Sequence, residues 1–370
     1  MEKMKKIRII AIIFVALVVA AGYLFYRASK HEGSLDGANS GRPERGLFNG
    51  RDVNTEEGGQ DISKENTEEL FPFSIPAMRE KIYPGSEITI VERLPDTLSY
   101  EQYLTTYESE GLTINALLTV PIGEQPEDGW PVIIFNHGYI PPEVYRTTER
   151  YEAYVDGFAR NGYVVFKPDY RGHGSSEGEP GGAYFSPGYT EDVLNAVSSV
   201  KKLEYVDTES IGMWGHSMGG YLTLRAMVIR DDIQAGVIWA GVIGTYQEIY
   251  DFWQSRETDW KPSEREQNAR RRSSEDVVRK YGVPSTDSPF WRSITPVNYI
   301  NDISGPLQLH QGTADKEVPV VYHRTVEAEM KEAGKTVEAY EYEGADHNLS
   351  GAAFGPAMDR SIMFFDQYLK

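Results

Sequence analysis

The spacing of hydrophobic and polar residues changes at about residue 130. Between residues 86 and 120, apolar and polar positions alternate in runs separated near Glu110 and Gly111, which is typical of antiparallel strands. After residue 130, short apolar runs alternate with stretches of helical periodicity, which indicates buried, mostly parallel strands. Strands are predicted at 132–135, 163–167, 211–214, 235–239, 307–309 and 337–342, and helices at 150–160, 191–203, 218–230, 322–333 and 358–368. This order predicts an α/β fold with a doubly wound, mostly parallel sheet over residues 131–370, preceded by a β-rich extension over residues 67–130.

One interval, residues 244–300, breaks this order. It contains no obvious strand, many aromatic residues and the basic run Arg270-Arg271-Arg272. We predict a helical insertion that covers the carboxyl edge of the sheet as a lid. Most of its aromatic residues are expected to pack a small core of their own, and the candidates for lining a pocket are Trp253, Trp291 and Tyr246. The arginine run is expected to be a solvated basic face, with binding of a ligand carboxylate as the alternative.

The first 66 residues have a different character. Residues 9–26 form an uncharged run of 18 residues, preceded by Lys3, Lys5, Lys6 and Arg8. At about 1.5 Å per residue the run spans ~27 Å, so residues 1–26 are predicted to be a basic tip and a single transmembrane helix. The positive-inside rule then places the rest of the chain outside the cytoplasm, attached to the cell membrane. The alternative is a cleaved signal peptide and a secreted protein. Residues 27–66, with seven glycines, are predicted to be a disordered tether.

Composition narrows the classes of partner. The 370-residue chain has 37 Lys and Arg against 56 Asp and Glu, a net charge of -19, which repels the phosphates of nucleic acids. Nucleic acid is therefore not an expected partner. The absence of cysteine excludes disulfides, thiolate zinc sites, iron–sulfur clusters and a thiol nucleophile. Because no metal-binding or dinucleotide motif is present, neither a metal nor a cofactor is expected.

Candidate chemistry is concentrated in the segment Gly215-His216-Ser217-Met218-Gly219-Gly220, between a predicted strand and a predicted helix. A G-x-S-x-G sequence in that context is typical of a nucleophile elbow, in which a sharp turn exposes the serine at the edge of the sheet. Glycines are needed there because the backbone on either side comes very close to the turn. We therefore predict that Ser217 is a nucleophile.

A serine hydroxyl needs a base, and the base needs a carboxylate to orient it. Of the seven histidines, His347 is the favoured base because it directly follows the last predicted strand. Asp315 follows the preceding strand, so Ser217, Asp315 and His347 have the chain order that this type of site uses. Asp346 and Glu317 are weaker candidates for the acid.

The anionic intermediate of acyl transfer needs two N–H donors. The N–H of Met218 follows the nucleophile, and the loop after the first predicted parallel strand supplies the second donor, which we assign to the N–H of Tyr139. Donation by the Tyr139 hydroxyl is an alternative, and so is simple packing of its ring against the pocket wall. A further loop at this edge contains Asp169 and Arg171, which are expected to brace the loops near the elbow.

From about residue 131 onward the chain resembles an α/β-hydrolase, and most of all the catalytic domain of the prolyl oligopeptidase family. The matching segments are Asn136-His137-Gly138-Tyr139, Asp169-Tyr170-Arg171-Gly172-His173-Gly174, Gly215-His216-Ser217-Met218-Gly219-Gly220, His310-Gln311-Gly312-Thr313-Ala314-Asp315 with Val318-Pro319, and Asp346-His347. The resemblance implies a serine hydrolase that acts on a peptide or an ester, with Ser217, Asp315 and His347 as its triad.

The resemblance has one departure. Family peptidases commonly carry an N-terminal β-propeller, which needs at least four blades of about 40 residues, and only residues 67–130 lie between the tether and the core. A propeller is therefore not expected, which leaves peptidase and esterase both open. A non-catalytic binding module is disfavoured by the complete triad, and an acyltransferase or thioesterase would use the same residues. No sequence feature predicts the oligomeric state.

Overall fold

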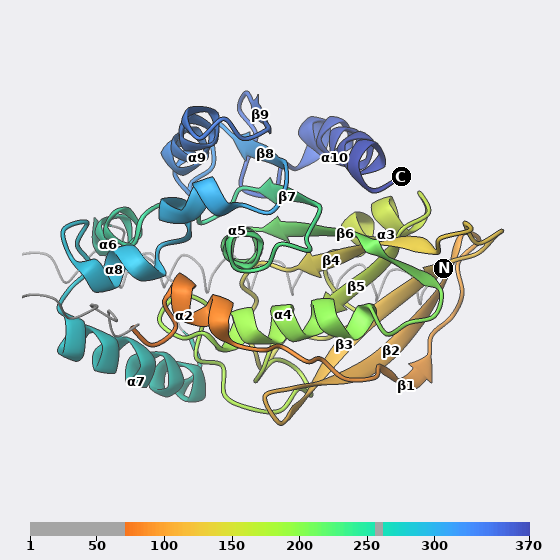
Figure 1. Ribbon diagram of the computed structural model, residues 1–370, viewed down its shortest axis with the longest axis horizontal. Helices are drawn as coiled ribbons and strands as arrows, with labels where there is room; N and C mark the ends of the chain where they lie inside the picture. The colour runs from red at the N-terminus through yellow and green to blue at the C-terminus, as the bar shows by residue number, and fades with distance from the viewer. Residues whose placement is uncertain (1–70, 256–261) are drawn as a thin grey trace, which may run out of the picture. The chain divides into compact units, whose positions relative to one another are not determined.

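A nine-stranded sheet runs through the part of the chain that this computed structural model describes, residues 71–255 and 262–370 (Figure 1). The strand order is β1-β2-β3-β5-β4-β6-β7-β8-β9. The strands are β1 (Thr89–Arg93), β2 (Tyr100–Ser109), β3 (Leu112–Pro121), β4 (Trp130–Asn136), β5 (Val164–Pro168), β6 (Val206–His216), β7 (Ala235–Trp239), β8 (Leu307–Gly312) and β9 (Val337–Tyr342). The five pairings from β5 to β9 are parallel and the three that involve β1, β2 and β3 are antiparallel, so the predicted α/β fold with a mostly parallel sheet is confirmed.

The hairpin of β2 and β3 shows how local sequence sets the register. The two strands pair from Tyr100↔Pro121 to Ser109↔Leu112, which leaves a two-residue turn. Both turn residues, Glu110 and Gly111, have positive φ, at 52° and 76°. Two-residue hairpin turns of this kind match the twist of the strands, and glycine adopts such a conformation without a steric cost.

Helices cover both faces of the sheet (Figure 1). They are α2 (Ile75–Glu80), α3 (Glu152–Ala159), α4 (Gly188–Val200), α5 (Met218–Ile229), α6 (Tyr246–Ser255), α7 (Glu264–Tyr281), α8 (Pro289–Ile294), α9 (Val320–Glu332) and α10 (Phe354–Leu369), with the 3-10 helices η1 (Pro296–Asp302) and η2 (Gly351–Ala353). Helices α3 and α10 pack together on one face, and α4 and α5 pack together on the other. The short helix α2 packs against α5 and was not expected from the sequence.

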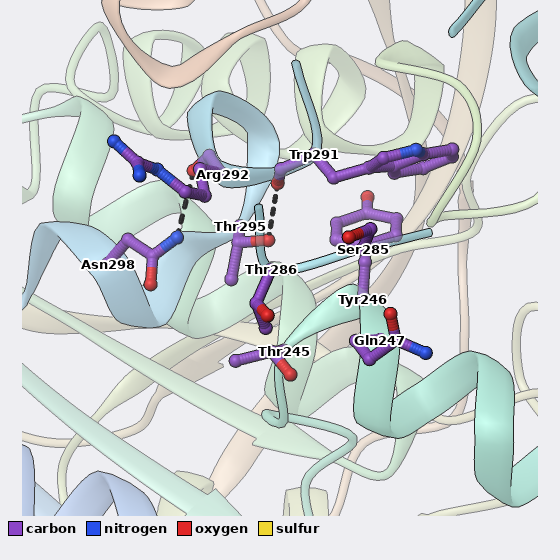
Figure 2. Close-up of a pocket in the computed structure, with 9 residues that line it drawn as sticks. All are labelled: Thr245, Tyr246, Gln247, Ser285, Thr286, Trp291, Arg292, Thr295 and Asn298. Carbon is purple, nitrogen blue, oxygen red and sulfur yellow. Dashed lines mark hydrogen bonds between the residues drawn. The ribbon is translucent and has the colours of Figure 1, made fainter. Parts of the chain in front are cut away.

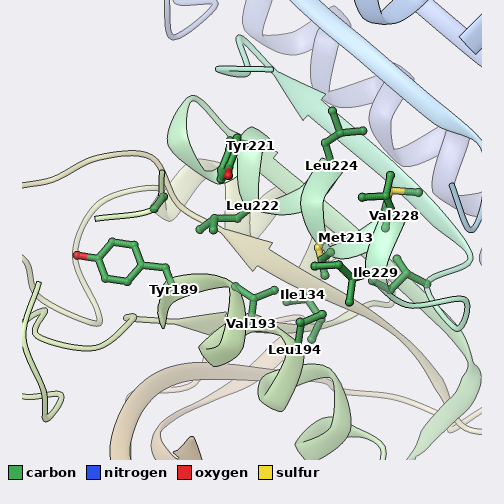
Figure 3. Close-up of a cluster of buried hydrophobic side chains, with 14 of the residues drawn as sticks. Ile134, Tyr189, Val193, Leu194, Met213, Tyr221, Leu222, Leu224, Val228 and Ile229 are labelled. Atoms are coloured by element: carbon green, nitrogen blue, oxygen red, sulfur yellow. The ribbon is translucent and has the colours of Figure 1, made fainter. Parts of the chain in front are cut away.

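Alternation along β4 divides the buried side chains into two clusters. Val132 and Ile134 point toward α4 and α5, whereas Ile133 and Phe135 point toward α3 and α10, as the two-residue repeat of a strand requires. Figure 3 shows part of the first cluster, which includes Ile134 of β4, Val193 of α4 and Leu222 of α5. Each such side chain contributes about 1.5–3 kcal/mol through burial, so this cluster fixes α5, and with it the elbow, on the sheet.

Between β7 and β8, the described residues form the helices α6, α7, α8 and η1, which are joined by turns and loops. Helices α6, α7 and α8 lie together at the left of Figure 1, away from β1. Residues 244–255 and 262–300 contain no strand.

The predicted transmembrane helix and tether, residues 1–66, lie outside the described residues. Within the described ranges, no helix combines the length and the apolar character needed to cross a bilayer.

Candidate active site

Ser217 stands at the sharp turn between β6 and α5, as predicted. Its backbone is strained, with φ 55° and ψ -118°, and its N–H donates to the carbonyl of Trp239 at 3.0 Å. A Cβ on Gly219 would lie 1.9 Å from the carbonyl oxygen of Asn136, and one on Gly215 would lie 2.3 Å from that of Gly219. Only glycine therefore allows α5 to approach β4 closely enough to form the turn.

Asp315 and His347 meet at the carboxyl ends of β8 and β9. His347 Nδ1 lies 2.8 Å from Asp315 Oδ2, and the carboxyl side chain is 1% exposed. Gln311 Nε2 also donates to Oδ2, and the N–H groups of Glu317 and Val318 donate to Oδ1. Burial raises the pKa of Asp315, but the hydrogen bond from His347 and those from the two backbone N–H groups lower it more, so that the net pKa is below the usual value. The carboxylate is therefore ionised at neutral pH and orients the imidazole.

Ser217 and His347 line one pocket of about 610 Å³. Both follow the carboxyl ends of parallel strands, where ligands of open α/β sheets bind. The pocket is lined by Gly138, Tyr139, Ile140, Pro141, Val144, Arg150, Tyr151, Tyr154, His216, Ser217, Glu317, His347, Asn348 and Ser350. The structure thus brings together the predicted nucleophile, base, acid and oxyanion loop.

Of the two predicted oxyanion donors, Met218 directly follows Ser217, and Tyr139 lines the same pocket as Ser217. Met218 is the first residue of α5, so its N–H has no acceptor within the helix. In the loop after β4, the N–H of Gly138 donates to Tyr151 Oη at 2.9 Å, and Tyr139 is the next residue along the chain. The Tyr139 hydroxyl donates to Glu266 Oε2 of α7 at 2.9 Å, so it is directed toward the insertion. The backbone N–H of Tyr139 therefore remains the better candidate.

The basic run of α7 is divided between two environments. Arg270 pairs with the buried Glu266 at 2.7 Å and lies over the Tyr139 ring, 4.8 Å from its centroid. Arg271 and Arg272 are exposed. The expected solvated face therefore applies to two of the three arginines, and Arg270 links α7 to the loop of the pocket.

An ion pair and a hydrogen bond hold the loop that was predicted to brace the elbow. Arg171 pairs with the buried Asp192 of α4 at 2.8 Å. Asp169 is buried and accepts a hydrogen bond from the Thr147 hydroxyl at 2.5 Å. Both contacts are structural, as expected.

The three aromatic residues predicted to bind substrate do not line the Ser217 pocket. Tyr246 and Trp291 are buried, with ring centroids 5.3 Å apart, and line a separate pocket of about 90 Å³ inside the insertion (Figure 2). Trp291 donates its indole N–H to the carbonyl of Gly282. Trp253 is 38% exposed and packs against Tyr184. The placement of Tyr246 and Trp291 argues against substrate contact, because their rings form the insertion's own core.

Several pocket residues were not predicted as site residues, and those with polar side chains suited to a role in the site include Arg150, Tyr151, Tyr154 and His216. Two of them could have been found from their positions in the sequence: Arg150 begins the segment predicted as the first helix, and His216 directly precedes the nucleophile. No group of three metal-ligating side chains occurs among the residues that the structure describes.

Comparison with known proteins agrees with this geometry. The sequence model of the prolyl oligopeptidase family matches residues 150–370. The chain is 27% identical over 268 residues to a Bacillus subtilis (strain 168) protein named uncharacterized peptidase YtmA, covering 70% of this chain and 90% of that protein.

Solved structures of a peptidase and of an esterase are among those that share the fold. Dipeptidyl peptidase 4 of Porphyromonas gingivalis superposes with a TM-score of 0.55 at 22% identity, over 73% of this chain and 36% of that one. Acetyl xylan esterase 1 from Thermoanaerobacterium sp. JW/SL YS485 superposes with a TM-score of 0.56 at 17% identity, over 79% of this chain and 90% of that one. The chain thus spans most of YtmA and of the esterase but about a third of the dipeptidyl peptidase. Because the family match extends over more than half of the sequence, the chain belongs to the prolyl oligopeptidase family and is a serine hydrolase of peptide or ester bonds.

Proposed function

We propose that this chain is a peptidase for short substrates and that it works through an acyl-enzyme on Ser217. Ser217 Oγ attacks the substrate carbonyl while His347 Nε2 takes its proton, and the N–H groups of Met218 and Tyr139 stabilise the resulting oxyanion. His347 then gives the proton to the leaving group, and a water molecule, activated in the same way, hydrolyses the acyl ester. The observation that carries this proposal is the Asp315–His347 pair at 2.8 Å beside the pocket that Ser217 lines.

The ionised state of Asp315 meets the requirement for cleaving an amide, the more demanding of the two bonds. An amine leaves only after it is protonated, so an amidase needs a stable imidazolium as its general acid. A buried, ionised carboxylate bound to Nδ1 stabilises that imidazolium. Esters with good leaving groups need less help, so we expect the same site to turn them over as well.

The pocket also contains a cation suited to substrate binding. Arg150 is exposed and lines the pocket, and it forms no ion pair with any residue in the described ranges. Because the chain as a whole has a net charge of -19, an unpaired arginine is a local attraction for an anionic group. We therefore include short peptides with a carboxylate on the acyl side of the bond among the proposed substrates.

The test compares bond types on one enzyme. Turnover of peptidyl p-nitroanilides and of acyl p-nitrophenyl esters would be measured with the detergent-solubilised full chain and with Ser217→Ala. Anilide turnover that disappears in Ser217→Ala supports a peptidase. Ester turnover alone, lost in the same variant, would make the enzyme an esterase, and turnover that persists in Ser217→Ala would overturn the assigned nucleophile.

The proposal extends to where the enzyme works. The uncharged run of residues 9–26 and the four basic residues before it support a single-pass anchor in the cell membrane, with the catalytic unit outside the cytoplasm. No nucleic acid partner is proposed. Sedimentation of the full chain with membranes, and its release when residues 1–26 are deleted, would support the anchor. A full chain that remains in the soluble fraction at its full length would contradict it.

A further inference from the structure

A chain of hydrogen bonds joins the oxyanion loop to the segment that carries His347. The N–H of Gly138 donates to Tyr151 Oη at 2.9 Å, Tyr151 Oη lies 2.7 Å from His216 Nδ1, and His216 Nε2 lies 3.0 Å from the carbonyl oxygen of His347. His216 is 3% exposed, and its ring centroid lies 4.6 Å from that of His347. Each of the three distances is within the normal range for a hydrogen bond, so the series of hydrogen bonds is uninterrupted.

The partners fix the direction of every bond in this chain. The His347 carbonyl can only accept, so His216 Nε2 carries a hydrogen and donates it. Burial lowers the pKa of His216 to about 3, so the imidazole is neutral at neutral pH and Nδ1 accepts from the Tyr151 hydroxyl. Tyr151 Oη in turn accepts from Gly138. All of the donors and acceptors in this series of hydrogen bonds are therefore satisfied in a single arrangement.

Helix α3 also makes a direct contact with the segment that carries His347. The Tyr154 hydroxyl donates to the carbonyl of Asn348 at 3.0 Å. Tyr151 and Tyr154 are three residues apart at the start of α3, so they lie on one face of the helix, with ring centroids 5.2 Å apart. The first turn of α3 thus contacts the backbone on both sides of the His347–Asn348 peptide bond, once directly and once through His216.

The backbone before α3 is held in an uncommon conformation. Arg150 and Tyr151 both have positive φ, at 62° and 57°. The ammonium group of the buried Lys167 lies 3.3 Å and 3.4 Å from the carbonyl oxygens of Glu149 and Arg150. Left-handed conformations of non-glycine residues persist where the surroundings fix them, and they are frequent at functional sites.

We propose that Tyr151, Tyr154 and His216 are positioning residues for His347: they set the place of the base relative to Ser217 and the oxyanion loop. This inference rests on the proposed role of His347 in catalysis. Its consequence is greatest where His347 must deliver a proton to the leaving group, because proton transfer is sensitive to displacements of about 1 Å. Loss of positioning therefore slows anilide hydrolysis more than hydrolysis of a p-nitrophenyl ester.

The first test uses the two classes of leaving group. Tyr151→Phe keeps the ring and removes the hydroxyl, and we expect kcat for a p-nitroanilide to fall about 10- to 100-fold, with a several-fold smaller fall for the matching ester. Active-site titration of each preparation gives the fraction of competent enzyme, so that misfolded protein is not counted. Equal losses on anilide and ester would contradict positioning, because they indicate a general loss of structure.

The second test asks whether Tyr151 and His216 act through one route. His216→Leu should lower anilide kcat by about as much as Tyr151→Phe, and the double variant should be no worse than the more impaired single variant. His216→Gln retains an N–H at the position of Nε2 and should recover most of the loss caused by His216→Leu. Tyr154→Phe removes a separate hydrogen bond, so the fold-loss in anilide kcat that it causes should multiply with the fold-loss caused by Tyr151→Phe.

The control is Tyr163→Phe, which removes a tyrosine hydroxyl bound to Asp366 at 2.6 Å, outside the pocket. It should reduce stability and leave both values of kcat unchanged. Multiplying effects of Tyr151→Phe and His216→Leu, or normal anilide turnover in both, would overturn the inference. If Ser217→Ala were still active, the proposed function itself would fail, whereas an inactive Ser217→Ala together with a normal Tyr151→Phe would overturn the positioning role alone.

Discussion

Among the individual residues, the ionised carboxylate of Asp315 has the largest effect on the proposed chemistry of His347. Its carboxylate is bound by an imidazole, an amide and two backbone N–H groups, which leaves it little freedom to turn. It therefore holds His347 in the tautomer that leaves Nε2 available as a base.

Asp315→Asn is expected to lower anilide kcat about 10³- to 10⁴-fold, because an amide at this position favours the wrong imidazole tautomer. The measurement is steady-state hydrolysis of a peptidyl p-nitroanilide at pH 8. Asp346→Asn is the comparison, since Asp346 accepts from the N–H groups of Asn348 and Ser350 and stabilises the loop. A larger loss in Asp346→Asn than in Asp315→Asn would show that the acid has been misassigned.

Arg150 gives a prediction about substrate choice. Arg150→Gln should raise KM for a succinyl-peptide p-nitroanilide about 2- to 5-fold, the range expected for an exposed ion pair, and should leave KM for the acetyl-peptide analogue unchanged. Arg160→Gln is a matched control, because Arg160 pairs with Asp156 and does not line the pocket. The assignment fails if the two substrates respond equally to Arg150→Gln.

At the scale of elements, the elbow depends on the close approach of α5 to β4. Gly219→Ala should destabilise the fold by about 3 kcal/mol or more and abolish activity, because its Cβ would lie 1.9 Å from the Asn136 carbonyl oxygen. Gly355→Ala in α10 is the control. That site has open space and an ordinary φ, so a gain of about 0.5–1 kcal/mol is expected. Denaturant unfolding of both variants checks the contrast, and a Gly219→Ala variant of normal stability would refute the steric argument.

The sequence allows the strands, the helices and the proposed triad to be predicted, but not the contacts between side chains that lie far apart in the sequence. The strands and helices after residue 130 were predicted because buried strands and amphipathic helices have distinct periods, and Ser217, Asp315 and His347 were found because each follows a strand at one edge of the sheet. The neighbours of Tyr151 could not be predicted, because they depend on a left-handed turn and on contacts between segments distant in sequence. The prediction that Tyr246 and Trp291 line the substrate pocket failed for a related reason. The aromatic composition of the insertion does not specify which side of each helix faces the pocket.

At the scale of the whole molecule, buried histidines make stability depend on pH. Burial lowers the pKa of His173 and of His216 to about 3 and that of His137 and His310 well below 6.5. These residues are neutral in the fold, whereas in the unfolded chain they bind protons below about pH 6.5. Their contribution to stability is therefore fully present above pH 6.5 and is lost as the pH falls toward the lowered values.

The free energy of unfolding should accordingly decrease as the pH falls, with a slope that approaches ~1.4 kcal/mol per pH unit for each such histidine well below pH 6.5. Chemical denaturation at pH 7, 6 and 5 measures the slope. His216→Gln removes one titrating group and should make the average slope between pH 7 and pH 5 shallower by about 1 kcal/mol per pH unit. A His216→Gln variant with the wild-type slope would mean that His216 is not a neutral, buried group in the native fold.

The central claim is that Ser217 is the nucleophile of an acyl-enzyme, activated by His347 and Asp315. The most direct measurement is mass spectrometry of the full chain after reaction with diisopropyl fluorophosphate, which phosphorylates activated serines. The account predicts one phosphoryl group per chain, located on Ser217, in parallel with loss of hydrolysis, and very slow labelling of Asp315→Asn. Complete inactivation with the label on another residue, or undiminished hydrolysis by fully labelled Ser217, would contradict it.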